Sequence, residues 1–191
     1  MAQACRERGI DVRVLISGYR PYELGIFKPD QKEVTVLKAF IRSKLHEYID
    51  EGAEWFIIQG YTGIELYAAE VIIELKEDGY DIRLGVLMPF HQFDDRYKEV
   101  DRETLNKVLA ESDFKDYIYK QPYTNPGMFK NINRFLISNT DSALIFFDEE
   151  AEAKVRFLYN AILEFSEKNQ YNIERIQFDE INSFIDTGFE D

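Results

Sequence analysis

The sequence predicts a doubly wound α/β fold, in which helices cover both faces of a mainly parallel sheet of about five strands. Short runs rich in β-branched and aromatic residues alternate along the chain with longer segments whose apolar residues recur every three or four positions. This alternation is typical of parallel strands joined by helical crossovers. The chain has 191 residues, of which 45% are hydrophobic, and this is enough for one well-buried core. We therefore expect a single Rossmann-like domain over residues 12–191.

Five runs are expected to form the strands: VRVLIS (12–17), WFIIQ (55–59), IRLGVLM (82–88), SALIFF (142–147) and IERIQF (173–178). Right-handed crossovers place the first of them near the middle of the sheet. The run YIYK (117–120) is a candidate for an additional short strand.

Helices are expected between these strands. In the first crossover, apolar residues recur at helical spacing from Val34 to Ile49. Asp30, with Glu33 three positions later, predicts a capping box at the start of this helix, and Gly52 is expected to end it. Further helices are expected near residues 62–78, 101–112, 126–139, 149–168 and 179–186.

The composition disfavours several classes of partner. There are 36 acidic and 23 basic residues, and the resulting net charge of -13 repels nucleic acid and anionic membranes. The longest apolar runs fall far short of the roughly 20 residues that span a bilayer, so we expect no membrane insertion. A lone Cys5 and a start without an apolar signal segment favour a cytoplasmic protein. Residues 1–11 are expected to form a charged extension.

Ligands of open α/β sheets bind beyond the carboxyl ends of the strands, where the strand order reverses. This rule selects SGYRP, QGYTGIE, PFHQF and DEE, which follow the first four expected strands. Proline and histidine in the third of these segments, Pro89 and His91, are candidates for ligand contact, although an exposed loop position is the alternative for His91.

The long loop after the first strand carries Gly18, Tyr19 and Arg20. Gly18 permits a close backbone approach, and the Arg20 guanidinium offers a forked donor to a phosphate or carboxylate. The alternative is structural: Gly18 turns the chain and Arg20 pairs with one of the many acids. The loop contains neither GxGxxG nor GxxxxGK[ST], which excludes the usual dinucleotide fingerprint and a Walker A loop.

The segment after the second strand has the form of half a nucleotide site. Thr62 is a candidate N-cap, and the first turn of the following helix has free N–H groups that can receive an anion. Glu65 lies three residues after Thr62, so a capping box is one explanation of its position. If Glu65 faces a ligand instead, its carboxylate is suited to accept hydrogen bonds from ribose hydroxyls, with the phosphate nearer Gly18 and Arg20.

A further candidate, Asn133, lies in the expected helix around NPGMFKNINRFLISNTD (125–141), on the same side as an apolar stripe. A half-buried asparagine needs hydrogen-bond partners, which are either a loop backbone or a ligand. The full set of candidate ligand-binding residues is Gly18, Tyr19, Arg20, Gln59, Gly60, Thr62, Gly63, Glu65, Pro89 and Asn133. Two histidines and one cysteine form no spaced metal-binding cluster, so we expect no metal and no bound cofactor.

Four segments carry a resemblance to a known family: SGYRPYELGIF, GYTGIELYAAE, the PF pair after the third strand, and FKNINRFLISNTDSALIFFD. In order and spacing they resemble the YpsA-like family, which belongs to the SLOG superfamily of Rossmann-like proteins. The resemblance implies distant relation to the LOG phosphoribohydrolases and to DNA-processing protein A. Phosphoribohydrolases carry PGGxGTxxE, whereas this chain has QGYTGIE.

The leading hypothesis is a cytoplasmic regulator or sensor that binds a nucleotide or a nucleotide-derived ligand. The resemblance implies a connection with cell division or envelope stress. Two alternatives stay open: an enzyme that hydrolyses a nucleotide N-glycosidic bond, with Glu65 assisting the ribose and Arg20 holding the phosphate, and a protein-interaction module with a vestigial cleft. The sequence does not specify the ligand, the protein partner or the oligomeric state.

Overall fold

The structure is a computed structural model that describes residues 11–186, and it confirms the doubly wound α/β fold. Most of the predicted N-terminal extension, residues 1–10, lies outside the described residues, as do residues 187–191. Six strands form one parallel sheet in the order β4-β3-β2-β1-β5-β6. Their bounds are β1 Val12–Ser17, β2 Ala53–Ile58, β3 Arg83–His91, β4 Phe114–Pro122, β5 Ser142–Phe146 and β6 Asn172–Ile176. As predicted, β1 lies in the interior of the sheet.

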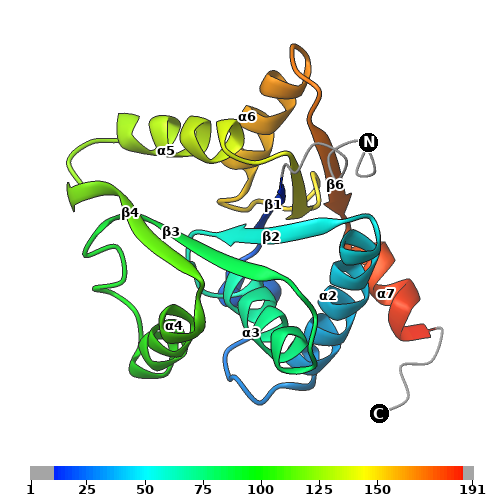
Figure 1. Ribbon diagram of the computed structural model, residues 1–191. Coiled ribbons are helices and arrows are strands. Elements are labelled where there is room, and N and C mark those ends of the chain that lie inside the picture. Colours follow the sequence, from blue (N-terminus) through cyan, green and yellow to red (C-terminus); the bar gives the residue numbers. More distant parts are fainter. Residues whose placement is uncertain (1–10, 187–191) are drawn as a thin grey trace.

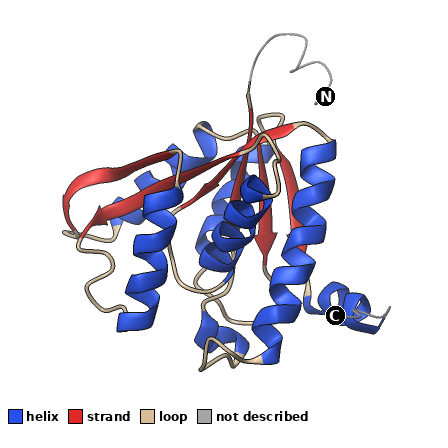
Figure 2. Cartoon of the chain, turned by 60° about the horizontal axis from the view of Figure 1, so that its bottom comes forward, coloured by secondary structure: helices blue, strands red, loops and turns tan. Residues whose placement is uncertain are grey.

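Helices cover both faces of the sheet. The 3-10 helix η1 (Pro21–Leu24) is followed by α2 Lys32–Asp50, α3 Ile64–Glu77, α4 Glu99–Glu111, α5 Gly127–Ser138, α6 Arg156–Ser166 and α7 Phe178–Asp186. Figure 1 shows α2, α3 and α4 on one face and α5 and α6 on the other, and Figure 2 shows the same layers from below. The chain changes face between β4 and β5, so the strand order reverses beside β1.

The sixth strand is the main difference from the expected sheet. The candidate run 117–120 lies inside β4, which pairs in parallel with β3 along the edge of the sheet. No residue of β4 is fully buried. A strand that is exposed at an edge does not need the continuous apolar run by which a central parallel strand is recognised, so its sequence signal is weak.

Three predicted boundaries were wrong. The capping box of Asp30 and Glu33 does not form, because the N-cap of α2 is Gln31, and its side-chain oxygen accepts from the backbone N–H groups of Phe27 and Lys28 in the preceding turn. The helix expected over 149–168 begins only at Arg156, after a series of turns.

The third boundary is the end of β3, which extends to His91, so PFHQF is not wholly a loop. Pro89 therefore lies within a strand. Proline is tolerated at this position because the pairing of β3 with β2 already ends at Val86. The N–H group that proline lacks would therefore have no partner on β2, and no hydrogen bond between these strands is lost.

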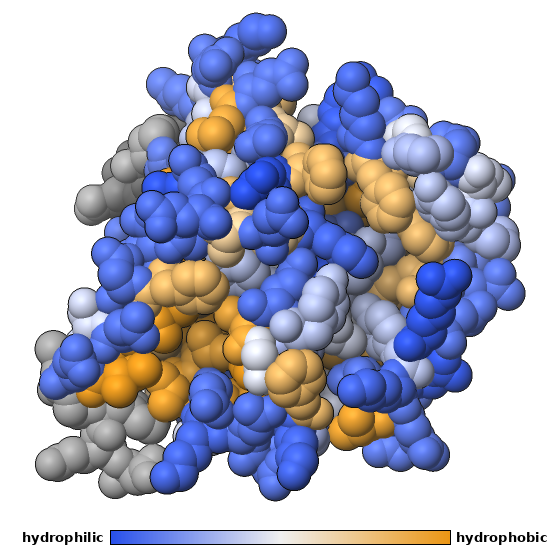
Figure 3. Space-filling view, turned by 180° about the vertical axis from the view of Figure 1, so that it is seen from behind, coloured by the Kyte–Doolittle hydropathy of each residue, from blue (hydrophilic) through white to orange (hydrophobic). Residues whose placement is uncertain are grey.

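The core is centred on β1, whose residues Val14, Leu15 and Ile16 have no solvent exposure. Such continuous burial is expected of a strand covered by helices on both faces. The outer surface is mostly hydrophilic, with apolar side chains gathered in a few places (Figure 3). The most exposed large apolar side chain among the described residues is Phe157, which is 77% exposed on α6.

Candidate functional site

The loops that follow β1 and β2 meet at the carboxyl edge of the sheet, as the pairing of these two neighbouring parallel strands requires. The backbone N–H of Ile64, at the start of α3, donates to the carbonyl oxygen of Tyr19 at 3.1 Å. Gly63 has φ 91°, and a side chain at this position would collide with that same carbonyl oxygen. SGYRP and QGYTGIE therefore meet in a direct backbone contact.

Gly18 also serves a close approach between parts of the protein. A Cβ atom at this position would lie 2.7 Å from the Cβ of Phe146 on β5 and 3.0 Å from the Cβ of Ile64 on α3. Such distances are shorter than packed carbon atoms tolerate. The glycine thus allows β1, β5 and α3 to pack together directly below the loops.

Tyr19 fills the position between β1 and β5 where the strand order reverses. Its side chain is 2% exposed, and its hydroxyl oxygen accepts a hydrogen bond from the backbone N–H of Asp148 at 2.6 Å. Its ring stacks on Phe178, the first residue of α7, with centroids 5.0 Å apart. Tyr19 therefore connects the loops after β1, β5 and β6.

Glu65 is fully buried and accepts four hydrogen bonds. Oε1 accepts from the hydroxyl of Ser17 at 2.6 Å, and Oε2 accepts from the backbone N–H groups of Gln59, Gly60 and Tyr61 at 2.9, 3.0 and 3.2 Å. Burial raises the pKa of the Glu65 carboxyl above its ordinary value, while Arg20, the Ser17 hydroxyl and the backbone N–H groups lower it.

The capping box, which was one of two explanations for Thr62 and Glu65, does not form. Gly63 is the N-cap of α3, and Glu65 reaches back past it to the turn that follows β2. Gln59 and Gly60 take part in the site through their backbone N–H groups. Thr62 is half-buried, and within residues 11–186 its side chain forms no hydrogen bond to this cluster.

Arg20 lies against the ring of Tyr61, with its guanidinium carbon 3.8 Å from the ring centroid. Its side chain is 15% exposed, and its Nη1 lies 4.0 Å from Oε1 of Glu65, beyond hydrogen-bond distance. Among residues 11–186, this buried nitrogen has no hydrogen-bond partner. A buried guanidinium N–H without an acceptor is unusual in proteins, and an anion that is bound at the site would satisfy it.

An aromatic wall behind Arg20 was not predicted from the sequence. The Tyr97 hydroxyl donates to the carbonyl oxygen of Gly60 at 3.0 Å, and the ring of Phe93 packs edge-to-face on both Tyr61 and Tyr97. Burial raises the pKa of Tyr61 to about 12. Ser17 and Tyr97 were missed because their partners lie 48 and 37 positions away in the chain, and no local spacing signals such a pair.

Three further candidate residues have no side-chain hydrogen bond to this cluster in the part of the chain that the structure describes. Asn133 is half-buried in the middle of α5, on the face of the sheet opposite α3 (Figure 1), and no side-chain hydrogen bond from it is found in the described part of the chain. Pro89 is buried in β3. His91 packs edge-to-face on Tyr117 of the neighbouring strand, with centroids 4.5 Å apart.

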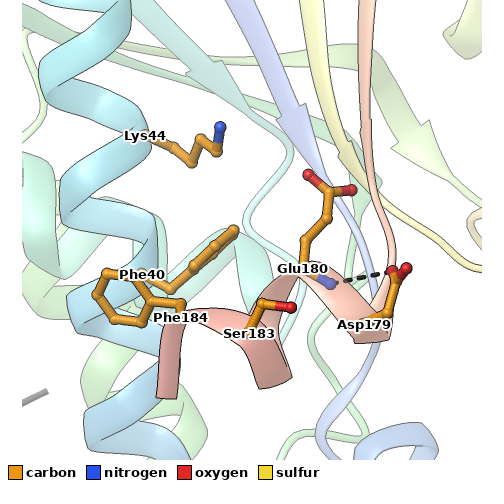
Figure 4. Close-up of a pocket in the computed structure, with 6 residues that line it drawn as sticks. All are labelled: Phe40, Lys44, Asp179, Glu180, Ser183 and Phe184. Atoms are coloured by element: carbon orange, nitrogen blue, oxygen red, sulfur yellow. Dashed lines mark hydrogen bonds between the residues drawn. The ribbon is translucent and has the colours of Figure 1, made fainter. Parts of the chain in front are cut away.

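Two surface pockets lie away from Arg20. One, of about 380 Å³, is lined by Phe40, Lys44, Asp179, Glu180, Ser183 and Phe184 of α2 and α7 (Figure 4). The other, of about 340 Å³, is lined by Asp148, Glu149, Glu150, Arg175, Gln177 and Asp179. Lys44 already pairs with Glu47 and Glu174, and Arg175 with Glu149. Nη1 of Arg175, like Nη1 of Arg20, is buried and has no hydrogen-bond partner among the described residues. The two differ in their ion pairs, because Nη1 of Arg175 lies 2.5 Å from Glu149, whereas Nη1 of Arg20 lies 4.0 Å from Glu65.

Over residues 11–186, no group of three or more histidine, cysteine or acidic side chains is placed to hold a metal ion. Within the same residues, none of the helices combines the length and the apolar character that crossing a membrane requires.

Comparison with known proteins matches the predicted resemblance. The YpsA family model, described as the YspA SLOG family, matches residues 14–181. A UPF0398 protein of Staphylococcus haemolyticus is 40% identical over 172 residues, which cover 90% of this chain and 92% of that protein. UPF0398 proteins of Macrococcus caseolyticus and Staphylococcus aureus are 37% and 36% identical over the same length, covering 90% of this chain and 93% and 92% of theirs. None of these names specifies a ligand or a reaction.

Proposed function

Since the chain belongs to the YpsA family of SLOG proteins, we propose that it is a regulatory or sensor protein that binds a nucleotide or nucleotide-derived ligand, whose phosphate contacts Arg20. The observation that carries the proposal is the Arg20 guanidinium. Its carbon lies 3.8 Å from the centroid of the Tyr61 ring, and its buried Nη1 lacks a hydrogen-bond partner among the described residues.

The chemistry of arginine explains why the anion is best described as a phosphate or a carboxylate. The planar guanidinium presents its N–H donors in a fork that matches two oxygens of such a group. Contact with the Tyr61 ring restricts the guanidinium before a ligand arrives, so less conformational entropy is lost on binding. The Arg20 side chain is 15% exposed, so a ligand approaches it from solvent, but Nη1 itself is buried, and a ligand contacts it only if a neighbouring side chain moves.

The burial and the hydrogen bonds of Glu65 favour a protein that binds its ligand over one that hydrolyses it. A glycosidase-type reaction requires a carboxyl group that can reach the sugar, either as an acid or as a nucleophile. Both oxygens of Glu65 are occupied by donors of the protein, and its side chain has no exposure. The site therefore lends no support to the hydrolytic alternative through this residue.

The proposal is tested by thermal unfolding of the wild-type protein and an Arg20→Met variant against a panel of nucleotides and their dephosphorylated nucleosides. We expect at least one phosphorylated compound to raise the Tm of the wild type. The variant is expected to bind it about ten- to a hundredfold more weakly, because charge-assisted hydrogen bonds contribute roughly 1.5–3 kcal/mol.

The matched control is Arg83→Met. The guanidinium carbon of Arg83 also lies over an aromatic ring, 5.5 Å from the centroid of Trp55. Arg83 is the first residue of β3, however, whereas Arg20 follows the carboxyl end of β1. This variant should retain the wild-type response. If no phosphorylated compound changes the Tm of the wild type, or if both variants respond alike, the proposal is wrong.

A further inference from the structure

The turn between β2 and α3 has the geometry of an anion-binding site. Three consecutive backbone N–H groups, those of Gln59, Gly60 and Tyr61, point at a single oxygen atom within 2.9–3.2 Å. Successive N–H groups that converge beside the start of a helix hold phosphate in many nucleotide-binding proteins. Here the oxygen belongs to Glu65 of the same chain.

The other oxygen of Glu65 has one hydrogen-bond donor and one nearby positive charge. It accepts from the Ser17 hydroxyl at 2.6 Å, and Nη1 of Arg20 lies 4.0 Å from it. The carboxylate is therefore surrounded by the donors and the positive charge that a phosphate would need. Since it has no solvent exposure, a second anion has neither space nor free donors at this turn.

We infer that the Glu65 carboxylate is a built-in anion that takes the place of a ligand phosphate at the start of α3. One consequence, which rests on the proposed function, concerns the ligand: its phosphate binds at Arg20 alone. The ligand class is then a nucleotide with a single phosphate at this site. A pyrophosphate that continues from Arg20 into the turn after β2 would meet the Glu65 carboxylate, and like charges at this distance repel.

The role of the Glu65 carboxylate is tested by removing it and supplying a small carboxylate, formate, from solution. Glu65→Gly removes the whole –CH2–CH2–COO⁻ side chain and leaves the three N–H groups and Ser17 facing a vacated space that is larger than a formate ion. We expect this variant to unfold at a lower Tm than the wild type in sodium chloride at pH 8. In 100 mM sodium formate at equal ionic strength, we expect the Tm to rise by roughly 3–6 °C if formate binds with a dissociation constant of about 10 mM.

Two control variants separate rescue from a general salt effect. Glu77→Gly makes the same change at an exposed position of α3 and should show no formate-dependent rise. Glu65→Gln fills the space with an uncharged side chain and should also give none. If Glu65→Gly does not fold in chloride, the soluble yield on refolding in formate is compared with that in chloride. The inference that Glu65 is a built-in anion would be overturned by equal yields in formate and chloride, or by an equal change in Tm for all three variants.

The ligand class is tested with a nucleoside 5′-monophosphate and the corresponding diphosphate. The wild type should bind the two within about threefold of each other, because the second phosphate gains no hydrogen bonds from the turn. Glu65→Gly should bind the diphosphate more tightly than the monophosphate, since the vacated N–H groups are within reach of Arg20. A wild type that binds the diphosphate tenfold more tightly would contradict the inference. If the wild type binds neither compound, the proposed function and this ligand class fail together, while formate rescue still decides the role of Glu65.

Discussion

Glu65 joins the two loops of the site through hydrogen bonds to residues from both. Ser17 precedes the first loop, and Gln59, Gly60 and Tyr61 belong to the second. A buried N–H that loses its acceptor costs about 1–3 kcal/mol. The conformation of the loops that carry Arg20 and Tyr61 therefore depends on this one carboxylate.

Glu65→Gln is expected to lower the free energy of unfolding by about 1–3 kcal/mol, because the neutral amide is a weaker acceptor for three N–H groups. Urea denaturation of the variant and the wild type measures this loss. In a simple capping box, glutamine serves as well as glutamate, and the substitution would be silent. An unchanged midpoint with an unchanged m-value would thus contradict the role of Glu65 described above.

At the scale of elements, α7 is attached to the site by one aromatic contact and to the rest of the fold by another. Phe178 stacks on Tyr19, and Phe184 packs edge-to-face on Phe40 of α2 at 5.3 Å. Tyr19 in turn bonds to the backbone of Asp148 after β5. The start of α7 and the loop after β1 are therefore held in one arrangement.

Phe178→Ala is expected to destabilise the protein by about 1–3 kcal/mol, less than a fully buried phenylalanine would, because this ring is only half-buried. Hydrogen exchange should show faster exchange in α7 and in residues 18–25, which pack against the lost ring. Phe157→Ala, at the exposed position on α6, should leave both stability and exchange unchanged. Equal effects of the two substitutions would show that the stack with Tyr19 contributes nothing specific.

Elements with strong local patterns were predictable, and those defined by distant partners were not. The continuous apolar runs of β1 and β5 identify buried strands, whereas the polar edge strand β4 gives little signal. In the site, the adjacency of β1 and β2 explains why the loop with Gly18 and Arg20 lies next to Glu65, whereas their role in ligand binding stays a prediction. The acceptor role of Glu65 was not predictable, because it depends on α3 starting at Ile64 and on Ser17, which is remote in the sequence.

At the scale of the whole molecule, the net charge of -13 places the proposed site in a negative electrostatic field. A field of this sign disfavours long polyanions such as nucleic acid, so the absence of nucleic-acid binding stays a prediction. A small anion can still bind where a cation is buried next to it, because interactions at short range and low exposure are screened less than those across the surface.

Buried tyrosines give the molecule a defined alkaline limit. Burial raises the pKa of Tyr61, Tyr67 and Tyr171 to about 12, whereas the unfolded chain has tyrosine pKa values of about 10. Groups with a raised pKa stabilise the fold fully below the unfolded value, and this stabilisation is lost as the pH rises towards 12. We expect the Tm to fall progressively above pH 10. In a titration followed by absorbance at 295 nm, some of the tyrosines should ionise only at a higher pH than the rest. Ionisation of all tyrosines near pH 10 without unfolding would contradict this burial.

The central claim is that Arg20 contacts the phosphate of a ligand, and a thermodynamic cycle tests it most directly. Calorimetry would measure the affinity of a bound nucleotide and of its nucleoside for the wild type and for Arg20→Met. If Arg20 contacts the phosphate, removing either partner loses the same interaction, and the two losses should fall short of additivity by about 1.5–3 kcal/mol. Losses that add within about 0.5 kcal/mol would show that Arg20 and the phosphate act independently, and would contradict the account.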